Sequence, residues 1–324
     1  MKIFVTRIIP EPGLELLRKE HEIEVYPYDR LPTKEEIIRR LKGKDGLLCL
    51  LSDTIDEDII NSEPNLKMIA NYAVGYNNID IEAATERGIP VSNTPGVLTD
   101  TTAEMAWALL FSVARRVVKG DKFTRSGRFK GWGPMLMLGQ DVTNKTLGVV
   151  GAGRIGTVFA LKSQGFNMNV LYVDASVNEA LENELGAKKV DLPILLKESD
   201  FISLHVPLNK STHHMISEKE LKMMKKSTIL INTSRGPVVN EQALVKSLKE
   251  KWIFGAGLDV YEHEPEINEE LKKLQNVILQ PHSASATVET RTKMAIMAAE
   301  NMIAGLRGET PPNCVNTEVF KGKL

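Results

Sequence analysis

A glycine-rich segment at residues 146–156 constrains the fold more than any other feature. It reads Thr-Leu-Gly-Val-Val-Gly-Ala-Gly-Arg-Ile-Gly, so an apolar run leads directly into glycines at 151, 153 and 156. A helical pattern follows over residues 155–164. In a strand–turn–helix unit, Gly151 permits the tight turn, Gly153 lets a pyrophosphate approach the backbone, and Gly156 lets the helix pack on the sheet. The first amides of such a helix face the phosphate, so the segment predicts a dinucleotide site.

Asp174 strengthens this prediction. It ends the next apolar run, residues 169–173, and lies 23 residues after Gly151. A carboxylate there accepts hydrogen bonds from the adenosine ribose hydroxyls and repels a 2′-phosphate. Residues 175–177 are Ala-Ser-Val, with no arginine to hold that phosphate. The sequence therefore predicts NAD, with NADH favoured over NADPH. The alternative is a plain glycine turn beside a surface aspartate.

Short apolar runs alternate with helical patterns along the whole chain. Before residue 100 the expected strands are at residues 3–5, 22–25, 45–51, 66–71 and 89–92. From residue 146 they are at residues 147–150, 169–173, 201–206, 227–232, 257–260 and 277–279. This spacing predicts parallel sheets covered by helices, with one α/β architecture used twice. Long helices are expected over residues 100–119 and 287–306. An irregular loop over residues 125–140 carries Trp132, which packs either on a partner or on its own domain.

The overall composition excludes several classes of protein. The 324 residues are enough for two domains, and 41 basic residues balance 42 acidic ones. A protein that binds nucleic acid usually carries a basic excess, so no nucleic acid is expected. No apolar stretch is long enough to span a membrane, and the first six residues resemble a strand rather than a signal peptide. Cys49 and Cys314 have no metal-ligand spacing, and two reduced thiols in a cytoplasmic protein are a simpler interpretation than one disulfide.

Three candidate catalytic residues follow predicted strands in the second half of the chain. Arg235 lies after the run 227–232, Glu264 after 257–260 and His282 after 277–279. Parallel sheets bind ligands at the carboxyl ends of their strands, so these side chains are expected at one edge. Singly, each has an ordinary structural interpretation: a salt bridge, a surface carboxylate and a loop histidine.

Reduction of a ketone by hydride requires such a set. Negative charge builds on the carbonyl oxygen, and histidine is a suitable proton donor near neutral pH. A carboxylate beside an imidazole orients it and favours its protonated form. An arginine polarises the carbonyl and holds a substrate carboxylate with its planar fork. His205 also ends a strand, but only its backbone is expected to border the cofactor. Asp259 is expected to accept a hydrogen bond from the nicotinamide carboxamide.

The chain resembles the D-isomer-specific 2-hydroxyacid dehydrogenase family over nearly its whole length. The segments that carry the resemblance are Asn71-Tyr-Ala-Val-Gly-Tyr-Asn-Asn-Ile-Asp80, the glycine motif with Asp174, His205-Val-Pro-Leu208, Asn232-Thr-Ser-Arg-Gly236, Gly257-Leu-Asp-Val260, Glu264-Pro265 and Pro281-His282. Arg235, Glu264 and His282 match the family's catalytic arginine, glutamate and histidine, at the intervals of 29 and 18 residues that the family uses.

The resemblance implies two doubly wound, Rossmann-like domains with a cleft between them. The substrate domain, flavodoxin-like and discontinuous, would comprise residues 1–98 and 286–324, and the NAD-binding domain residues 99–285. A homodimer through the cofactor domain is implied. The expected cofactor-binding residues are Gly151, Gly153, Arg154, Ile155, Gly156, Asp174, His205, Val206, Pro207, Thr233, Asp259 and Thr102. The expected substrate-binding residues are Leu51, Val74, Gly75, Arg235 and His282.

Within the family the chain is most similar to glyoxylate/hydroxypyruvate reductases, which implies NADH-dependent reduction of a small 2-oxo acid. The loop over residues 51–54 is Leu-Ser-Asp-Thr and offers no cation for a phosphorylated substrate. The family commonly has a glycine soon after the catalytic histidine, whereas this chain has Ala284, which would narrow the nicotinamide side of the cleft. Two alternatives stay open. One is an NAD-sensing, corepressor-like protein of the same fold, although the tails of such proteins are not expected here. The other is a dehydrogenase for another substrate, such as 3-phosphoglycerate, phosphite or a bulky 2-oxo acid.

Overall fold

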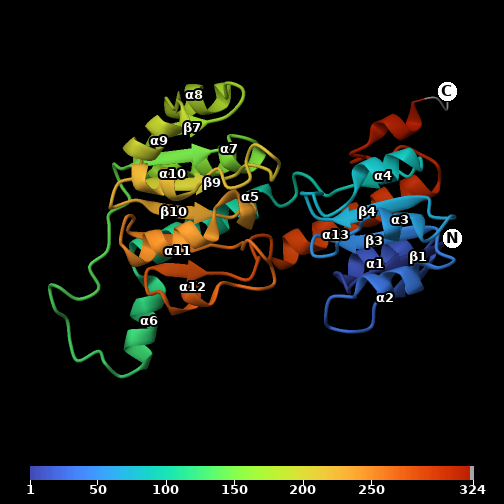
Figure 1. Ribbon diagram of the computed structural model, residues 1–324, viewed down its shortest axis with the longest axis horizontal. Helices are drawn as coiled ribbons and strands as arrows, with labels where there is room; N and C mark the ends of the chain where they lie inside the picture. The colour runs from blue at the N-terminus through green and yellow to red at the C-terminus, as the bar shows by residue number, and fades with distance from the viewer. Residues whose placement is uncertain (322–324) are drawn as a thin grey trace. The chain divides into compact units, whose positions relative to one another are not determined.

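The computed structural model describes residues 1–321, and the chain divides into two compact units. Unit 1 comprises Met1–Leu98 with Ala286–Leu324, and unit 2 comprises Thr99–Ser285. Figure 1 follows the chain through both units by colour. Each unit is built on one parallel sheet flanked by helices, which confirms the predicted α/β class with two doubly wound sheets.

Unit 1 contains a five-stranded sheet in the order β2-β1-β3-β4-β5. Its strands are β1 (Lys2–Val5), β2 (Glu22–Val25), β3 (Gly46–Leu50), β4 (Met68–Tyr72) and β5 (Val91–Ser92). Its helices are α1 (Glu11–Arg18), α2 (Lys34–Leu41), α3 (Glu57–Asn61), α4 (Ile81–Glu86), α13 (Val288–Leu306) and the 3₁₀ turn η3 (Thr317–Phe320). All strand pairs are parallel, and the order is the 2-1-3-4-5 arrangement of flavodoxin-like sheets.

The discontinuity of unit 1 comes from α13, which packs on α1 and β4. Thr287 begins this helix by accepting a hydrogen bond from the Thr290 amide. The hydroxyl of Tyr72 donates to the Arg291 carbonyl at 2.7 Å, and the Asn301 amide donates to the Asn93 carbonyl at 3.1 Å. The last helix therefore completes the first sheet.

Unit 2 contains a seven-stranded parallel sheet in the order β12-β11-β10-β9-β6-β7-β8. Its strands are β6 (Thr146–Val150), β7 (Asn169–Val173), β8 (Lys188–Lys189), β9 (Phe201–Leu204), β10 (Ile229–Asn232), β11 (Gly255–Leu258) and β12 (Val277–Leu279). Its helices are α5 (Thr99–Ala114), α6 (Val117–Arg125), α7 (Arg154–Leu161), η1 (Lys162–Phe166), α8 (Glu179–Leu185), α9 (Leu192–Glu198), α10 (Glu218–Met223), η2 (Gly236–Val238), α11 (Glu241–Lys249) and α12 (Glu269–Lys273). The winding direction reverses between β6 and β9, the place where doubly wound sheets bind ligands.

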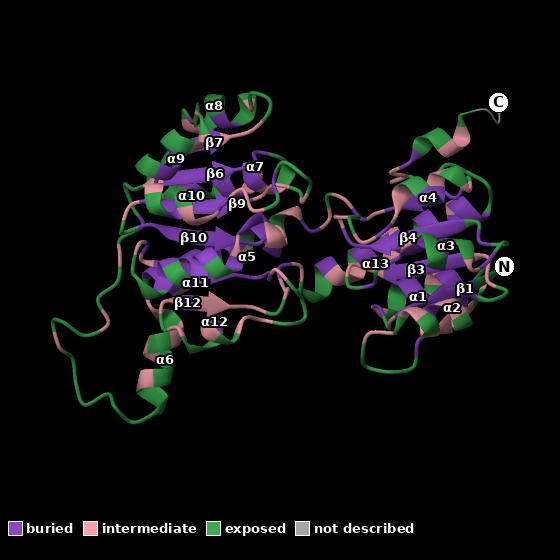
Figure 2. Ribbon diagram, in the orientation of Figure 1, coloured by how far each residue is buried: buried purple, intermediate pink, exposed green. Residues whose placement is uncertain are grey.

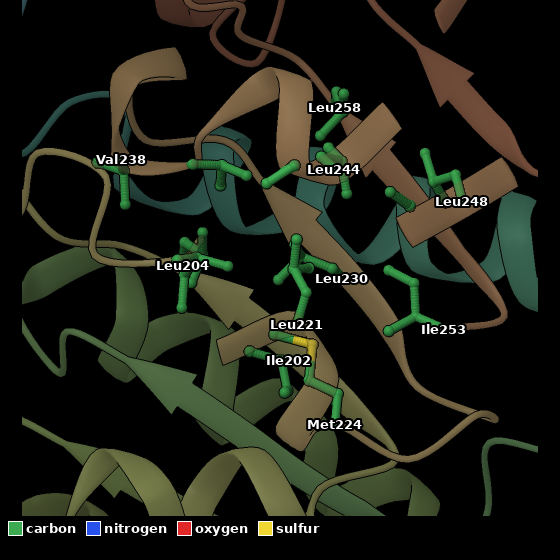
Figure 3. Packing of buried hydrophobic residues seen from close by; sticks show 14 of the residues in the cluster. Ile202, Leu204, Leu221, Met224, Leu230, Val238, Leu244, Leu248, Ile253 and Leu258 are labelled. Carbon is green, nitrogen blue, oxygen red and sulfur yellow. The ribbon is translucent and has the colours of Figure 1, made fainter. Parts of the chain in front are cut away.

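The central strands of the unit 2 sheet, β9 and β10, are buried along their whole length and purple in Figure 2. Leu230 faces one side, where β9 and β10 pack against α10 and α11 in the cluster of Figure 3. Its neighbours Ile229 and Ile231 face the other side, against α5 and α7. This alternation explains the near-continuous apolar runs, because a parallel strand covered on both faces has no solvent side.

The prediction of a single helix over residues 100–119 is wrong. The structure contains two helices, and Arg116 lies between them in the left-handed conformation, with φ of 54°. The amide of Gln140 donates to the Ala114 carbonyl at 2.8 Å, and the Arg116 side chain donates to the Leu138 carbonyl. A segment more than 20 residues away in sequence thus binds the end of α5, a contact that helical periodicity cannot reveal. No helix among residues 1–321 is both long and apolar enough to cross a membrane.

Candidate active site

The unit 2 sheet presents most of the predicted residues at the carboxyl ends of its strands. Gly151 follows β6, His205 follows β9, and Thr233 follows β10. Asp259 follows β11, and His282 lies three residues after β12. Because these strands are parallel neighbours, their ends form one edge. The segments that carry the predicted arginine, glutamate and histidine thus leave the same sheet edge as the predicted dinucleotide turn.

The turn after β6 requires glycine for physical reasons. Gly151 has φ of 93°, and a Cβ there would lie 2.8 Å from the His205 carbonyl group. A Cβ on Gly156 would collide with the Gly151 carbonyl oxygen, so this glycine allows α7 to pack against the turn. Gly153 begins α7 without a side-chain cap, and no atom lies within 4 Å of its Cβ position. The start of α7 is therefore open to an anionic group.

Asp174 and Asn178 hold this turn in place. One Asp174 carboxylate oxygen accepts the Ala152 amide at 2.7 Å, while the residue stays half-buried. The Asn178 side chain donates to the Ala152 carbonyl at 2.9 Å and to the Thr157 hydroxyl at 2.7 Å. Asn178 carries no sequence signal beyond that of a common helix cap, so its contribution was not predicted.

The residues around this turn fit a nicotinamide dinucleotide. The Thr233 hydroxyl is buried and lacks a hydrogen-bond partner within the described chain, which leaves a polar atom for a bound group to satisfy. Arg154 and Ile155 form the first turn of α7, and Val206 and Pro207 continue the chain after His205. Thr102 is buried in α5. No group of three or more His, Cys, Asp or Glu side chains among residues 1–321 could hold a metal ion.

His205 is not suited to proton transfer. Its ring packs on Phe159 with centroids 5.0 Å apart, and its Nε2 lies 2.9 Å from the Ser203 hydroxyl. Burial lowers the pKa of His205 to about 3, since the protonated ring would lose its hydration. This side chain is therefore neutral at physiological pH.

Glu264 and His282 form a hydrogen-bonded pair. His282 Nδ1 lies 2.7 Å from one Glu264 carboxylate oxygen, and the other oxygen accepts the Tyr261 amide at 2.9 Å. Burial raises the pKa of Glu264, but the hydrogen bond and charge of His282, the Tyr261 amide and the charge of Arg235 together lower it. The carboxylate is thus ionised and fixes the ring through Nδ1, which leaves Nε2 for another partner.

The turn that carries His282 is held by Asp259. His282 has φ of 51°, a left-handed conformation that disfavours a non-glycine residue. The next two amides, of Ser283 and Ala284, donate to the two Asp259 carboxylate oxygens at 2.7 and 2.9 Å. Asp259 is fully buried; burial raises its pKa, and the two amides oppose this effect. The contact with the nicotinamide carboxamide expected for Asp259 stays a prediction, whereas its contacts with the His282 turn are direct.

Arg235 lies in a second fixed turn. The Asn232 side chain donates to the Arg235 carbonyl at 3.0 Å and accepts the Ser234 amide and hydroxyl. Gly236 packs so closely on Tyr261 that a Cβ would collide with the Tyr261 carbonyl oxygen. Burial lowers the pKa of Arg235, and the charge of Glu264 opposes this. The turn that carries Arg235 therefore packs directly on the segment that leads to Glu264.

The predicted substrate-binding residues outside unit 2 lie in unit 1. Leu51 follows β3, and Val74 and Gly75 follow β4. All three are half-buried, at the carboxyl ends of neighbouring parallel strands. This is again the ligand-binding edge of a doubly wound sheet.

Comparison with known proteins agrees with this geometry. Residues 107–284 match the model of the D-isomer specific 2-hydroxyacid dehydrogenase, NAD binding domain. A glyoxylate reductase of Thermococcus litoralis is 54% identical over 323 residues, which cover 98% of each chain. A crystal structure of a Thermus thermophilus protein is similar with a TM-score of 0.92 and 43% identity, covering 97% of this chain and 100% of the other. An NADPH-dependent glyoxylate/hydroxypyruvate reductase from Sinorhizobium meliloti, in complex with NADP and malonate, has a TM-score of 0.86 and 30% identity, covering 97% and 96%.

The glyoxylate reductase and the solved structures match nearly the whole chain. The matched domain binds a nicotinamide cofactor, and the protein is an oxidoreductase. The chain belongs to the D-isomer-specific 2-hydroxyacid dehydrogenase family.

Proposed function

We propose that the enzyme reduces glyoxylate to glycolate with NADH, and hydroxypyruvate to D-glycerate by the same reaction. The observation that carries this proposal is the Glu264–His282 pair, joined at 2.7 Å on the sheet edge that bears the dinucleotide turn. The similarity to the Thermococcus litoralis glyoxylate reductase supports the choice of substrate. The comparisons do not favour the corepressor-like alternative.

The proposed mechanism assigns a separate task to each side chain. When bound, the nicotinamide supplies the hydride that reduces the 2-oxo carbon. His282 donates a proton to the carbonyl oxygen, which becomes the hydroxyl of the product. Glu264 orients the imidazole and stabilises its protonated form by charge. Arg235 stabilises the negative charge on the carbonyl oxygen and binds the substrate carboxylate.

Unit 1 is proposed as the substrate-binding domain and unit 2 as the NAD-binding domain. Backbone amides near Val74 and Gly75 would hold the substrate carboxylate, and Leu51 would limit the size of the pocket. The strand-end position of these residues supports the assignment.

A substrate panel tests the function. We expect NADH-dependent reduction of glyoxylate and hydroxypyruvate, and a lower kcat/KM for 3-phosphohydroxypyruvate than for hydroxypyruvate. The physical reason is that the loop over residues 51–54 offers no cation for the phosphate. Initial rates for the acids, measured over matched concentrations, give the values of kcat/KM that are compared. A higher kcat/KM for the phosphorylated acid, or no turnover of either small acid, would contradict the proposal.

Asp174 is proposed to make NADH the preferred cofactor, although the Sinorhizobium meliloti relative is NADPH-dependent. We expect a higher kcat/KM for NADH than for NADPH in the unmodified enzyme. The double variant Asp174→Ser with Ala175→Arg should shift the ratio toward NADPH, because it removes the repelling carboxylate and adds a phosphate-binding cation. Ala175→Arg alone is the matched control and should shift the ratio less. Faster turnover of the unmodified enzyme with NADPH at limiting cofactor would show that this view of the ribose pocket is wrong.

We also propose a homodimer formed through unit 2. The segment between α6 and β6 runs away from the sheet as a green loop in Figure 1. It carries Trp132, which is 86% exposed, and the exposed side chains of Phe129, Met135 and Leu138. An apolar group of this kind is typical of protein interfaces. Sedimentation velocity tests the proposal, and a monomer at micromolar concentration would contradict it.

The cytoplasmic location stays a prediction.

A further inference from the structure

Two loops of unit 1 carry the residues that the proposed function assigns to the substrate. The β3 loop, residues 50–55, contains Leu51, and the β4 loop, residues 73–79, contains Val74 and Gly75. The two loops follow neighbouring parallel strands. The room that the proposed substrate has between these loops depends on how firmly one loop is placed against the other.

Asn78 joins these loops through both its side chain and its backbone. Its side-chain amide donates to the Leu50 carbonyl at 3.1 Å and to the Asp53 carbonyl at 3.0 Å. Its own carbonyl accepts the Ile55 amide at 2.8 Å. One residue of the β4 loop therefore contacts the β3 loop at three points that surround Leu51.

The β4 loop is itself oriented by two further asparagines. The Asn71 side chain, which is buried, donates to the Gly75 carbonyl at 2.9 Å and to the Asn78 side-chain oxygen at 3.1 Å. The Asn93 side chain donates to the Val74 carbonyl at 2.7 Å. The N–H of a trans peptide points opposite to its C=O, so fixing the Val74 carbonyl also fixes the Gly75 amide in the reverse direction. The amide proposed to bind the carboxylate is therefore oriented by the side chains of Asn71 and Asn93.

The β3 loop is also shaped before Asn78 contacts it. The Asp53 carboxylate is buried and accepts the Leu50 amide at 2.7 Å and the Thr6 hydroxyl. The Asp53 amide donates back to the Leu50 carbonyl at 3.0 Å. Leu51 thus lies in a closed turn, and Asn78 binds the two carbonyl groups that begin and end it.

We propose that Asn78 is a positioning residue that sets the distance between the carboxylate-binding amides of the β4 loop and Leu51 of the β3 loop. It thereby determines how large a 2-oxo acid the enzyme accepts. This inference rests on the proposed function. Only an amide side chain suits the position, because it donates twice to carbonyl groups and accepts once from Asn71. An aspartate of the same shape would place a negative charge against both carbonyl oxygens.

The test is the Asn78→Asp variant, assayed with glyoxylate and hydroxypyruvate. We expect KM for glyoxylate to rise about 10-fold with kcat changed less than about 2-fold, since the loops bind the substrate equally before and during hydride transfer. The kcat/KM for hydroxypyruvate relative to glyoxylate should rise about 3-fold, because a displaced Leu51 admits the larger acid. The KM for NADH should not change. If the aspartate variant fails to fold, Asn78→Ser replaces it. This variant removes the hydrogen bonds to the β3 loop without adding charge and should produce the same pattern.

Asn316→Asp is a matched control in the same unit. Asn316 is fully buried; its side chain donates to the Thr85 hydroxyl and the Ile89 carbonyl, both at 2.9 Å, and accepts the Val91 amide at 2.7 Å. The control thus loses the side-chain donor to a hydroxyl and to a backbone carbonyl, and neither belongs to the β3 or β4 loop. We expect it to lower Tm as Asn78→Asp does, while KM and the substrate ratio keep their unmodified values.

Hydrogen exchange of the protein without substrate provides a second readout. Amides of residues 50–55 and 73–79 should exchange faster in Asn78→Asp and not in Asn316→Asp. The inference is overturned if the two variants change KM equally, or if Asn78→Asp leaves KM, the substrate ratio and loop exchange unchanged. If the unmodified enzyme does not reduce glyoxylate, the proposed function fails by itself. The 2-oxo acid reduced fastest in the panel then replaces glyoxylate, and the exchange comparison stands unaltered.

Discussion

Replacing His282 by alanine should lower kcat for glyoxylate reduction by about 10²–10⁴-fold, the usual contribution of a positioned general acid. His282 contributes mainly in the transition state, when the carbonyl oxygen gains charge, so KM should change much less than kcat. NADH binding should change little, because the residues proposed for the phosphates and ribose lie after β6 and β7. Steady-state kinetics and a fluorescence titration with NADH measure these quantities. Near-normal kcat would mean that another group is the acid.

Glu264→Gln is the companion variant for this prediction. The Glu264 carboxylate is held ionised and lies 2.7 Å from His282 Nδ1, so its negative charge attracts a proton on the ring. Glutamine keeps the shape and an acceptor oxygen but removes the charge. We therefore expect the fall of reduction rate with rising pH to begin at lower pH than in the unmodified enzyme. An unchanged pH profile would show that Glu264 does not act through His282.

Replacing Arg235 by alanine should raise KM for glyoxylate and lower kcat together. Arg235 is proposed to contact the substrate carboxylate in the ground state and the developing oxyanion in the transition state. Loss of one preorganised oxyanion donor typically lowers kcat by about 10²–10³-fold. The KM should rise about 10-fold or more, because a charge-assisted hydrogen bond to the substrate is lost. Rates across a wide range of glyoxylate concentration separate the two effects.

Arg235→Lys tests the geometry of this contact. An ammonium keeps the charge but not the planar fork, so we expect only partial recovery of kcat and KM relative to alanine. Thermal unfolding of both variants is the necessary control, because Arg235 is half-buried and its turn packs on Tyr261. Full recovery by lysine would mean that a point charge is sufficient. A change in kcat alone would show that Arg235 does not bind the ground-state substrate.

Much of the fold could be predicted from local sequence. The strands at residues 22–25, 169–173 and 277–279 have the predicted bounds. Short apolar runs that alternate with capped helical patterns favour parallel strands, because helices on both sides of a parallel sheet bury both faces of each strand. The glycines at 151 and 156 were predictable from the spacing of their motif. The structure supplies the physical reason, because a Cβ on Gly151 would lie 2.8 Å from the His205 carbonyl group and one on Gly156 would collide with the Gly151 carbonyl oxygen. The order of the strands in each sheet had to come from the family resemblance or the structure.

What sequence alone could not supply are the contacts between residues that are distant along the chain. Glu264 and His282 were predicted as partners, and the cofactor contact expected for Asp259 stays a prediction. The hydrogen bonds that its two carboxylate oxygens accept from the amides after His282 had no sequence signal. The break between α5 and α6 depends on the Gln140 amide. The sequence shows Asn78 only as a polar loop residue, and its hydrogen bonds to the Leu50 and Asp53 carbonyl groups are seen only in the structure. Sequence determined the backbone pattern and the types of reactive side chain, because these follow from local periodicity and steric limits. Tertiary structure decided how the turns that carry those side chains are held, because a hydrogen bond depends on the distance and direction between segments that only folding brings together.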